Sequence, residues 1–359
     1  MTTKRFLVMA GGTGGHVFPA LATARRLQEQ GHEVFWLGSK GGMEERLISE
    51  TDIPMATISV SGLRGKGRLA LVTAPFRLVR ALGQALGIVR RIRPDCVIGM
   101  GGFVTGPGGM AAWLTRTPLL VHEQNAIAGM TNRILARFAK TVMEAFPGSF
   151  GQDVVTRYTG NPVRGDLATM EAPGTRFNSR QGPLRLLVLG GSLGARAINE
   201  TVPRVLAQLG ADRMTVRHQC GTRNLEDTEA CYREAGVEAS LEPFIQDMAE
   251  AYRWADVVLC RAGALTIAEL CAVGLGAILV PFPHAVDDHQ TLNGQQMVQA
   301  GAAMLIPQDK LTDEVLAETL SGLLDDRNQV VALAEAARSL ARADATERVV
   351  NYCLEAAHG

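Results

Sequence analysis

Residues 11–16, Gly-Gly-Thr-Gly-Gly-His, combine a turn suited to anions with a side chain that can transfer a proton. Glycines let backbone N–H groups approach a phosphate, and the start of the helix predicted to follow favours negative charge. Histidine ordinarily titrates near neutrality, so His16 is a candidate general base. The turn is no dinucleotide fingerprint, because Val17 occupies the position of the last glycine, and no P-loop, because no Gly-Lys-Ser/Thr follows. A tight turn without a ligand is the alternative.

Three further segments repeat this design of strand, small-residue turn and helix start. They are residues 99–109, 190–194 and 260–269. In the last of these, Thr266 and the backbone N–H groups are candidates to bind a diphosphate, and Glu269 to accept hydrogen bonds from ribose hydroxyls. Taken alone, that segment is interpreted more simply as a capped helix with an exposed glutamate.

The sequence offers little for a metal or a disulfide. It contains no Asp-x-Asp, and residues 287–289, Asp-Asp-His, are as typical of a loop as of a ligand set. Six cysteines are scattered without a Cys-x-x-Cys pair, and most lie in apolar runs, as expected of small buried side chains in a reducing compartment. We therefore predict neither a metal nor another cofactor.

Short apolar runs alternate with amphipathic segments along the whole chain, which predicts parallel sheets covered by helices. The predicted strands are 6–10, 33–37, 55–60, 96–100, 119–122 and 141–146, then 185–189, 215–219, 240–244, 256–260, 277–281 and 303–306. The segment from residue 312 onward is predicted to be helical only. Residues 7–15 resemble residues 186–194, so the fold class is α/β with two tandem Rossmann-like domains. We place the domains at 1–162 and 163–340, with a C-terminal helix near 341–359 that packs back on the first, and expect a cleft between them.

Length and charge agree with two globular domains. The 359 residues are 47% hydrophobic and carry no net charge, but the two halves differ. Residues 1–160 hold 19 Lys and Arg against 10 Asp and Glu, whereas residues 161–359 hold 17 against 26. The first half is therefore expected to meet anions. Neither a signal peptide nor a membrane-spanning segment is predicted, so membrane contact would be peripheral.

Residues 53–94 contain eight basic side chains, no acidic one, and interleaved apolar residues. Apolar side chains rimmed by Arg and Lys suit an anionic membrane surface. The residues expected to make this contact are Leu69, Val72, Phe76, Arg77, Val79, Arg80, Leu82, Leu86, Arg90 and Arg91. Nucleic acid is disfavoured because the segment has one aromatic residue and no nucleic-acid motif. A core-facing helix with a solvated basic face is the alternative.

Six motifs together resemble the MurG family of glycosyltransferases, which add N-acetylglucosamine (GlcNAc) to lipid I in bacterial peptidoglycan synthesis. They are residues 11–19 (GGTGGHVFP), 101–106 (GGFVTG), 122–125 (HEQN), 159–164 (TGNPVR), 190–195 (GGSLGA) and 261–266 (RAGALT). Each is weak alone, but their order and spacing cover nearly the whole chain.

The resemblance implies the GT-B architecture, with UDP-GlcNAc held mainly by the second domain. The implied donor contacts are Arg164 and Ile245 at the uracil, Ser192, Ala264, Leu265 and Thr266 at the diphosphate, Glu269 at the ribose, and Thr13, Gly14, Gly15, Asn125 and Gln290 near the sugar. At Gln290 the sequence departs from the family pattern, because His289-Gln290-Thr291 stands where that loop typically has a Gln-Gln pair.

The resemblance also implies an acceptor, lipid I, whose pyrophosphate lies on the glycine turns of the first domain. Gly14, Gly15, Gly102, Thr105 and Gly106 are the residues expected there. The implied reaction is metal-independent inversion to a β-1,4 link, giving lipid II for cell wall biogenesis, cell shape and cell division. His16 is the candidate base or a substrate-binding residue, and Glu123 is a second base or a support for the loop of Asn125. The location implied is the cytoplasmic face of the inner membrane.

Three other functions are weighed against this one. A UDP-GlcNAc 2-epimerase would share the architecture without a lipid acceptor or a basic apolar patch. An NAD-dependent oxidoreductase is disfavoured by the absent fingerprint. A non-catalytic nucleotide sensor on the membrane is the third.

Overall fold

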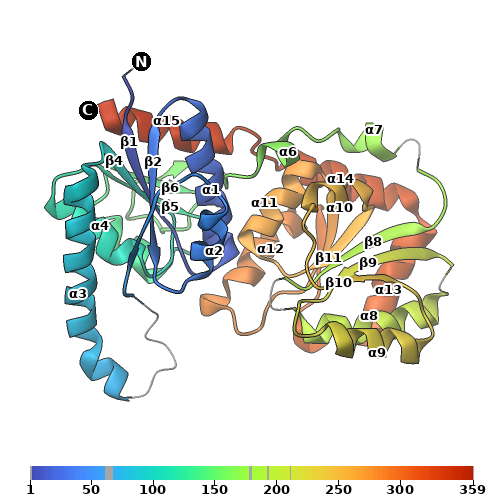
Figure 1. Ribbon diagram of the computed structural model, residues 1–359. Helices are drawn as coiled ribbons and strands as arrows, with labels where there is room; N and C mark the ends of the chain where they lie inside the picture. Colours follow the sequence, from blue (N-terminus) through green and yellow to red (C-terminus); the bar gives the residue numbers. More distant parts are fainter. Residues whose placement is uncertain (1, 61–67, 178–179, 192–193, 211, 359) are drawn as a thin grey trace. The chain divides into compact units, whose positions relative to one another are not determined.

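The computed structural model describes residues 2–60, 68–177, 180–191, 194–210 and 212–358 (Figure 1). The chain divides into two compact units, Met1–Arg164 with Asp344–Gly359, and Gly165–Ala343. Each unit contains one parallel β-sheet with helices packed on it. The predicted fold class, two tandem Rossmann-like α/β domains, is confirmed.

The first unit is built on a seven-stranded sheet in the order β3-β2-β1-β4-β5-β6-β7. The strands are β1 (Arg5–Met9), β2 (Glu33–Ser39), β3 (Met55–Ile58), β4 (Cys96–Gly99), β5 (Leu119–Glu123), β6 (Thr141–Glu144) and β7 (Arg157–Tyr158). The helices are α1 (Gly14–Glu29), α2 (Met43–Ser49), α3 (Arg68–Ile92), α4 (Thr105–Leu114), α5 (Met130–Leu135) and α15 (Ala345–His358). The sequence predicts all of these strands except β7, since a two-residue edge strand has no periodic pattern.

Alternate side chains of the buried strands feed two separate cores, one on each face of this sheet. Phe6 and Val8 of β1 pack with residues of α1 and α15. Leu7 and Met9 point the other way, toward residues of α3 and α4. Burial on both faces explains why these strands are continuous apolar runs instead of alternating ones.

The C-terminal helix α15 belongs to the first unit. Val349 and Cys353 are fully buried in the core that contains α1. Arg26 Nε of α1 forms an ion pair with Glu347 Oε1 at 2.5 Å. The end of the chain therefore covers the same face of the sheet as the first helix (Figure 1).

The second unit is built on a six-stranded sheet in the order β10-β9-β8-β11-β12-β13. The strands are β8 (Leu184–Leu189), β9 (Met214–Gln219), β10 (Ser240–Glu242), β11 (Val257–Cys260), β12 (Gly276–Leu279) and β13 (Ala303–Leu305). The helices are α6 (Gly165–Ala168), α7 (Pro173–Phe177), α8 (Arg196–Leu209), α9 (Leu225–Ala235), α10 (Met248–Trp254), α11 (Ala264–Val273), α12 (His289–Gln299), α13 (Asp313–Asp325) and α14 (Arg327–Ser339), with 3-10 turns η1 (Val286–Asp288) and η2 (Gln308–Lys310). Every strand predicted for this half is present, and the region after residue 312 is helical as predicted.

Strand order reverses beside β1 in the first sheet and beside β8 in the second. On one side of β1 the strands follow in the order β2 and β3, and on its other side in the order β4, β5, β6 and β7; β8 likewise has β9 and β10 on one side and β11, β12 and β13 on the other. Ligands of parallel sheets bind at the carboxyl ends of strands on such switch points. All four glycine or small-residue turns singled out from the sequence follow β1, β4, β8 and β11.

The turns after β1 and β4 are in backbone contact. Gly11 N donates a hydrogen bond to Gly101 O at 3.3 Å. Gly102 has φ +88°, and a Cβ on it would lie 2.3 Å from Gly11 O. Only glycine fits at this position, so the two turns meet because Gly102 lacks a side chain.

We predict that Gly102→Ala destabilises the protein by more than a comparable glycine replacement. The alanine would cost about 1–2 kcal/mol for its left-handed backbone and would also push the two turns apart. Gly148→Ala is the matched control, because Gly148 has φ +85° and a Cβ added there would meet no atom within 4 Å. Urea denaturation measures both, and equal losses of unfolding free energy would contradict the close approach.

Candidate active site

The turn at residues 11–13 leads directly into the start of α1. Thr13 is the N-cap residue and Gly14 and Gly15 are the first helical residues, with no side-chain cap in the described part of the chain. The first N–H groups of a helix lack partners within the helix and attract anions. The turn therefore has the geometry of an anion site, as the sequence predicts.

A buried carboxylate holds this turn in place. Glu44 is fully buried and accepts hydrogen bonds from Gly12 N at 3.2 Å and Ser39 N at 2.8 Å. Burial alone would raise the pKa of Glu44, but the hydrogen bonds from Ser39 and Gly12 outweigh it and lower that pKa. Glu44 also fills the space beside Gly11, where a Cβ would lie 2.4 Å from Oε1.

His16 lies against the second glycine turn and joins a chain of hydrogen bonds. Its Nδ1 is 2.8 Å from Gln124 Oε1. A Cβ on Gly101 would lie 2.4 Å from the same Nδ1, so the ring fits because residue 101 is glycine. The series of hydrogen bonds continues from Gln124 Nε2 to His122 Nδ1 at 3.0 Å, and His122 Nε2 lies 3.0 Å from Gly160 O.

Glu123 uses both carboxylate oxygens to hold the loop after β5. Its Oε1 accepts from Asn125 N at 3.0 Å and Asn125 Nδ2 at 3.1 Å. Its Oε2 accepts from Gly129 N at 3.1 Å and Asn132 Nδ2 at 2.9 Å. A buried carboxylate with four donors favours the loop-supporting role over that of a base.

The second glycine turn is braced from inside. Thr105 is fully buried at the start of α4, and its hydroxyl donates to Gly102 O at 2.7 Å. Gly106 follows it in the first turn of the helix. Thr105 thus fixes the turn, and its backbone, together with that of Gly106, supplies the helix start.

In the second unit, the side chain of Gln219 makes two hydrogen bonds to the turn after β8. Gly191 N donates to Gln219 Oε1 at 3.0 Å, and Gln219 Nε2 donates to Gly191 O at 2.9 Å. Gly190 has room for no side chain, since a Cβ there would lie 2.9 Å from Ala195 N. Ser192, the predicted diphosphate ligand of this turn, lies outside the described residues.

Apart from Ser192, the predicted diphosphate and ribose contacts lie on one helix. Gly263 is the N-cap residue of α11, and Ala264, Leu265 and Thr266 form its first turn. Glu269 follows one turn later, and its Oε2 accepts a hydrogen bond from the buried Tyr252 hydroxyl at 2.9 Å.

The remaining predicted donor contacts are spread over other segments. Ile245 is buried in the segment after β10. Gln290, at the start of α12, accepts from Phe282 N through Oε1 at 2.9 Å, so in this structure it holds the preceding loop. Arg164 is half-buried at the end of the first unit's main segment.

Helix α3 exposes part of the predicted membrane contact. Phe76 is 78% exposed and Val79 70% exposed, and Arg77, Arg80, Arg90 and Arg91 are exposed. We call these six residues the α3 patch. Leu82 and Leu86 instead pack against the core, because they lie on the helix face turned to the sheet. The side chains of Leu69 and Val72 lie outside the described part.

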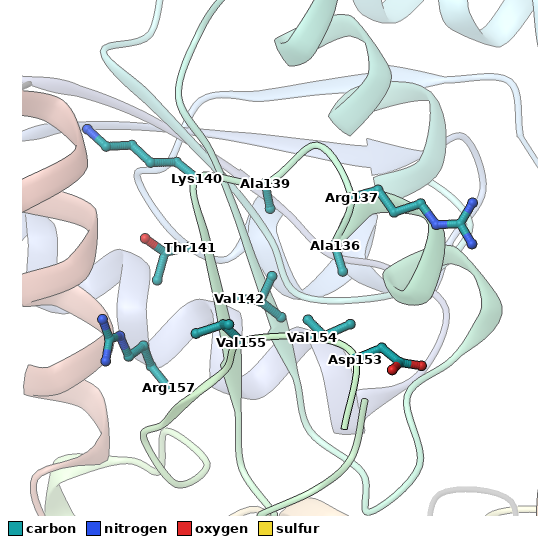
Figure 2. Close-up of a pocket in the computed structure, with 10 residues that line it drawn as sticks. All are labelled: Ala136, Arg137, Ala139, Lys140, Thr141, Val142, Asp153, Val154, Val155 and Arg157. Carbon is teal, nitrogen blue, oxygen red and sulfur yellow. The ribbon is translucent and has the colours of Figure 1, made fainter. Parts of the chain in front are cut away.

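A separate pocket of about 380 Å³ lies in the first unit, at the end of the strands opposite the glycine turns (Figure 2). It is lined by residues at the start of β6 and β7, including Thr141 and Arg157. Figure 2 shows Val142, Val154 and Val155 near its middle, whereas the charged ends of Arg137 and Lys140 point outward. The glycine turns lie at the other ends of the strands, so this pocket is no part of the candidate site.

Two features are absent from the described residues. No group of three or more His, Cys, Asp or Glu side chains there is placed to hold a metal ion. No helix in those same ranges is long and apolar enough to span a membrane.

Both halves of the chain match one glycosyltransferase family. The family model of the glycosyltransferase family 28 N-terminal domain matches residues 6–144, and that of the family 28 C-terminal domain matches residues 185–349. The chain belongs to glycosyltransferase family 28.

Relatives in this family cover the full chain. A protein of Marinobacter nauticus is 71% identical over 357 residues, which are 99% of this chain and 98% of the relative. A protein of Hahella chejuensis is 57% identical over 99% of each chain. Both are named UDP-N-acetylglucosamine--N-acetylmuramyl-(pentapeptide) pyrophosphoryl-undecaprenol N-acetylglucosamine transferase. The crystal structure of Acinetobacter baumannii MurG is 42% identical, with a TM-score of 0.84 over 98% of this chain and 99% of that one. The resemblance to the MurG family is confirmed.

Two buried histidines generate a pH prediction for this family member. Burial lowers the pKa of His122 to about 4 and that of His218 to about 3. Unfolded histidine titrates near 6.5, so between about pH 6.5 and 4 the unfolded chain binds protons that the folded chain does not. The contribution of each histidine to the free energy of unfolding is therefore fully present above about pH 6.5, and it falls on acidification by about 1.4 kcal/mol per pH unit.

Urea denaturation at several pH values measures this slope in the parent and in His218→Gln. His218 contacts the Tyr232 hydroxyl and Asn199 Oδ1, each at 3.0 Å, and a glutamine amide in its place is polar but takes up no proton in this pH range. The variant should lose one histidine's share of the slope. An unchanged slope would show that His218 does not resist protonation in the folded state.

Proposed function

We propose that this chain transfers GlcNAc from UDP-GlcNAc to the 4-hydroxyl of the N-acetylmuramyl group of lipid I, forming a β-1,4 link and lipid II. The observation that carries this is the 71% identity, over 98% of its length, to the Marinobacter nauticus transferase. The reaction places the chain in peptidoglycan synthesis. The epimerase alternative is less well supported, because the full-length relatives in family 28 are named as transferases.

The second unit binds the donor in this proposal. The start of α11 offers backbone N–H groups to the diphosphate, and Glu269 accepts hydrogen bonds from the ribose. Tyr252 supports this role, since its hydroxyl orients one carboxylate oxygen of Glu269. Helix N-termini also stabilise the charge that develops on UDP as it leaves, without a metal ion.

The first unit binds the acceptor. Its two glycine turns receive the pyrophosphate. His16, in the first turn of α1, is the base that accepts the proton of the attacking hydroxyl. An alcohol is a weak nucleophile, so removing its proton as the bond forms lowers the barrier. Attack on the α-linked sugar from the face opposite UDP inverts the configuration. Asn125, held by Glu123, contacts the donor sugar.

The α3 patch docks the chain on the cytoplasmic leaflet of the inner membrane in this proposal. Lipid I keeps its hydrocarbon tail in the bilayer, so the protein must approach the headgroup. Exposed Phe76 and Val79 lie on the same helix as four exposed arginines, which suits an interface rich in anionic lipid.

Incubation with labelled UDP-GlcNAc and a short-chain lipid I analogue tests the function. Label should enter the lipid-linked product with release of UDP, and the rate should persist in EDTA. Conversion of UDP-GlcNAc to its 2-epimer without acceptor would contradict the transferase assignment. Activity lost in EDTA and restored by a divalent ion would contradict a metal-independent reaction.

Glu269→Ala should raise the donor KM by about ten- to a hundredfold, because hydrogen bonds to a charged group contribute about 1.5–3 kcal/mol. Tyr252→Phe is the matched control, since it keeps the carboxylate and removes one hydrogen bond to it. Steady-state kinetics at saturating acceptor should give Tyr252→Phe a smaller rise. A donor KM unaffected by Glu269→Ala would reject the ribose contact.

Replacing four basic residues of the α3 patch by Ser should weaken binding to anionic liposomes, by at most about 4 kcal/mol. The four are Arg77, Arg80, Arg90 and Arg91. The control removes four positive charges from the second unit, at Arg223, Arg233, Arg253 and Lys310. Sedimentation at low and high salt should separate the two variants, while activity on a water-soluble acceptor survives in both. Parent-like sedimentation of the patch variant would contradict docking through α3.

A further inference from the structure

The hydrogen bonds beyond His16 restrict which of its ring nitrogens carries the proton. They run through two side chains that no part of the reaction otherwise uses, Gln124 and His122. Both are buried, with Gln124 1% exposed and His122 fully buried. Each link can be assigned a donor and an acceptor, because backbone carbonyls at two points can only accept.

The first fixed point is the Gly160 carbonyl. It lies 3.0 Å from His122 Nε2 and can only accept, so that nitrogen carries a hydrogen. The Thr159 hydroxyl, 3.2 Å from the same nitrogen, donates its own hydrogen to Gly160 O at 3.0 Å. Burial keeps the ring of His122 neutral, with a pKa lowered to about 4. A neutral ring has one N–H, so Nδ1 of His122 is an acceptor.

The second fixed point is the carbonyl of His122 itself. Gln124 Nε2 donates to His122 O at 3.2 Å and also lies 3.0 Å from His122 Nδ1. Both contacts need an amide nitrogen, so the orientation of the Gln124 amide is set. Its Oε1 then faces His16 Nδ1 at 2.8 Å, and only an N–H on His16 can complete that bond.

We propose that Gln124, oriented by His122, is a positioning residue that holds the proton of His16 on Nδ1 and leaves the Nε2 lone pair available to the acceptor hydroxyl. Among the described residues, no hydrogen-bond partner occupies Nε2. Gly101 packs against the Nδ1 side of the ring, which limits its rotation. A base needs the correct tautomer before the substrate arrives, as in other enzymes where a third group orients a catalytic histidine.

The proton balance of the step follows from this tautomer. The hydroxyl oxygen bonds to the anomeric carbon, and the bond from that carbon to UDP breaks with its electron pair leaving on UDP. The hydroxyl proton moves to His16 Nε2. The resulting imidazolium keeps Nδ1–H donated to Gln124 Oε1, and later releases the Nε2 proton to water. This inference rests on the proposed role of His16 as the base.

The tautomer is measured in the free protein by two-bond ¹H–¹⁵N correlation spectra of the full chain labelled with [¹⁵N]histidine, at alkaline pH where the neutral ring is observed. The chain has 7 histidines, and the His16 signal is identified by its loss in His16→Gln. The parent should show a proton on Nδ1 of His16. A proton on Nε2 would overturn the inference without any need for a variant.

Two replacements of Gln124 separate a positioning role from a packing role. Gln124→Met keeps the size of the side chain and removes the acceptor, so His16 should lose its Nδ1 preference and kcat should fall on the order of 100-fold with an unchanged donor KM. Gln124→Glu keeps an acceptor opposite Nδ1, so the tautomer and most of kcat should remain. A packing role predicts the opposite order, because methionine suits a buried site better than a carboxylate.

The outcomes distinguish this inference from the proposed function. A parent chain that transfers no label to the lipid I analogue refutes the function, while the tautomer is still read from the spectrum. If Gln124→Met retains the Nδ1 proton, or shifts it without loss of kcat, the positioning role is wrong even in an active transferase.

Discussion

The close approach of two glycine backbones at the ends of β1 and β4 is the constraint on which the first unit's site depends. Gly102 has no side chain, so its turn reaches Gly11, and Gly101 then lies against the ring of His16. Glu44 holds the other turn by its amides. These contacts bring two helix starts and an imidazole to one edge of a rigid parallel sheet, where anionic ligands bind.

In the second unit, a buried glutamine holds the turn at the end of β8. Gln219 directly follows His218 at the end of β9. In the first unit, His122 lies near the end of β5 and Gln124 comes two positions later. The Gln219 amide hydrogen-bonds both the N–H and the carbonyl of Gly191, whereas the Gln124 amide hydrogen-bonds His122 and His16. Both buried histidines are kept neutral by desolvation, which lowers the pKa of each. In each unit, buried polar side chains thus hold a group at the switch point: the ring of His16 in the first unit and the turn at Gly191 in the second.

Local patterns in the sequence were enough to predict the fold, because buried parallel strands are apolar on both faces and stand out between amphipathic helices. The positions of the glycine turns at strand ends followed from the same pattern. Glu44, Gln124, Gln219 and Tyr252 were not predicted as part of the site, because their roles depend on contacts across 5–108 residues of chain. No local signal marks such contacts, although Gln124 stands within the HEQN motif. Which apolar residues of α3 face the core was also not evident from composition, as Leu82 and Leu86 show.

In the proposed reaction, the acceptor hydroxyl, activated at His16, displaces UDP directly from the sugar. The configuration at the new glycosidic bond tests this claim most directly, and it is measured by the one-bond ¹H–¹³C coupling of product made from UDP-[¹³C]GlcNAc. A single displacement on the α-linked donor predicts a β-linked disaccharide. An α-linked product would contradict the account, because it requires either two displacements or attack on the same face as UDP.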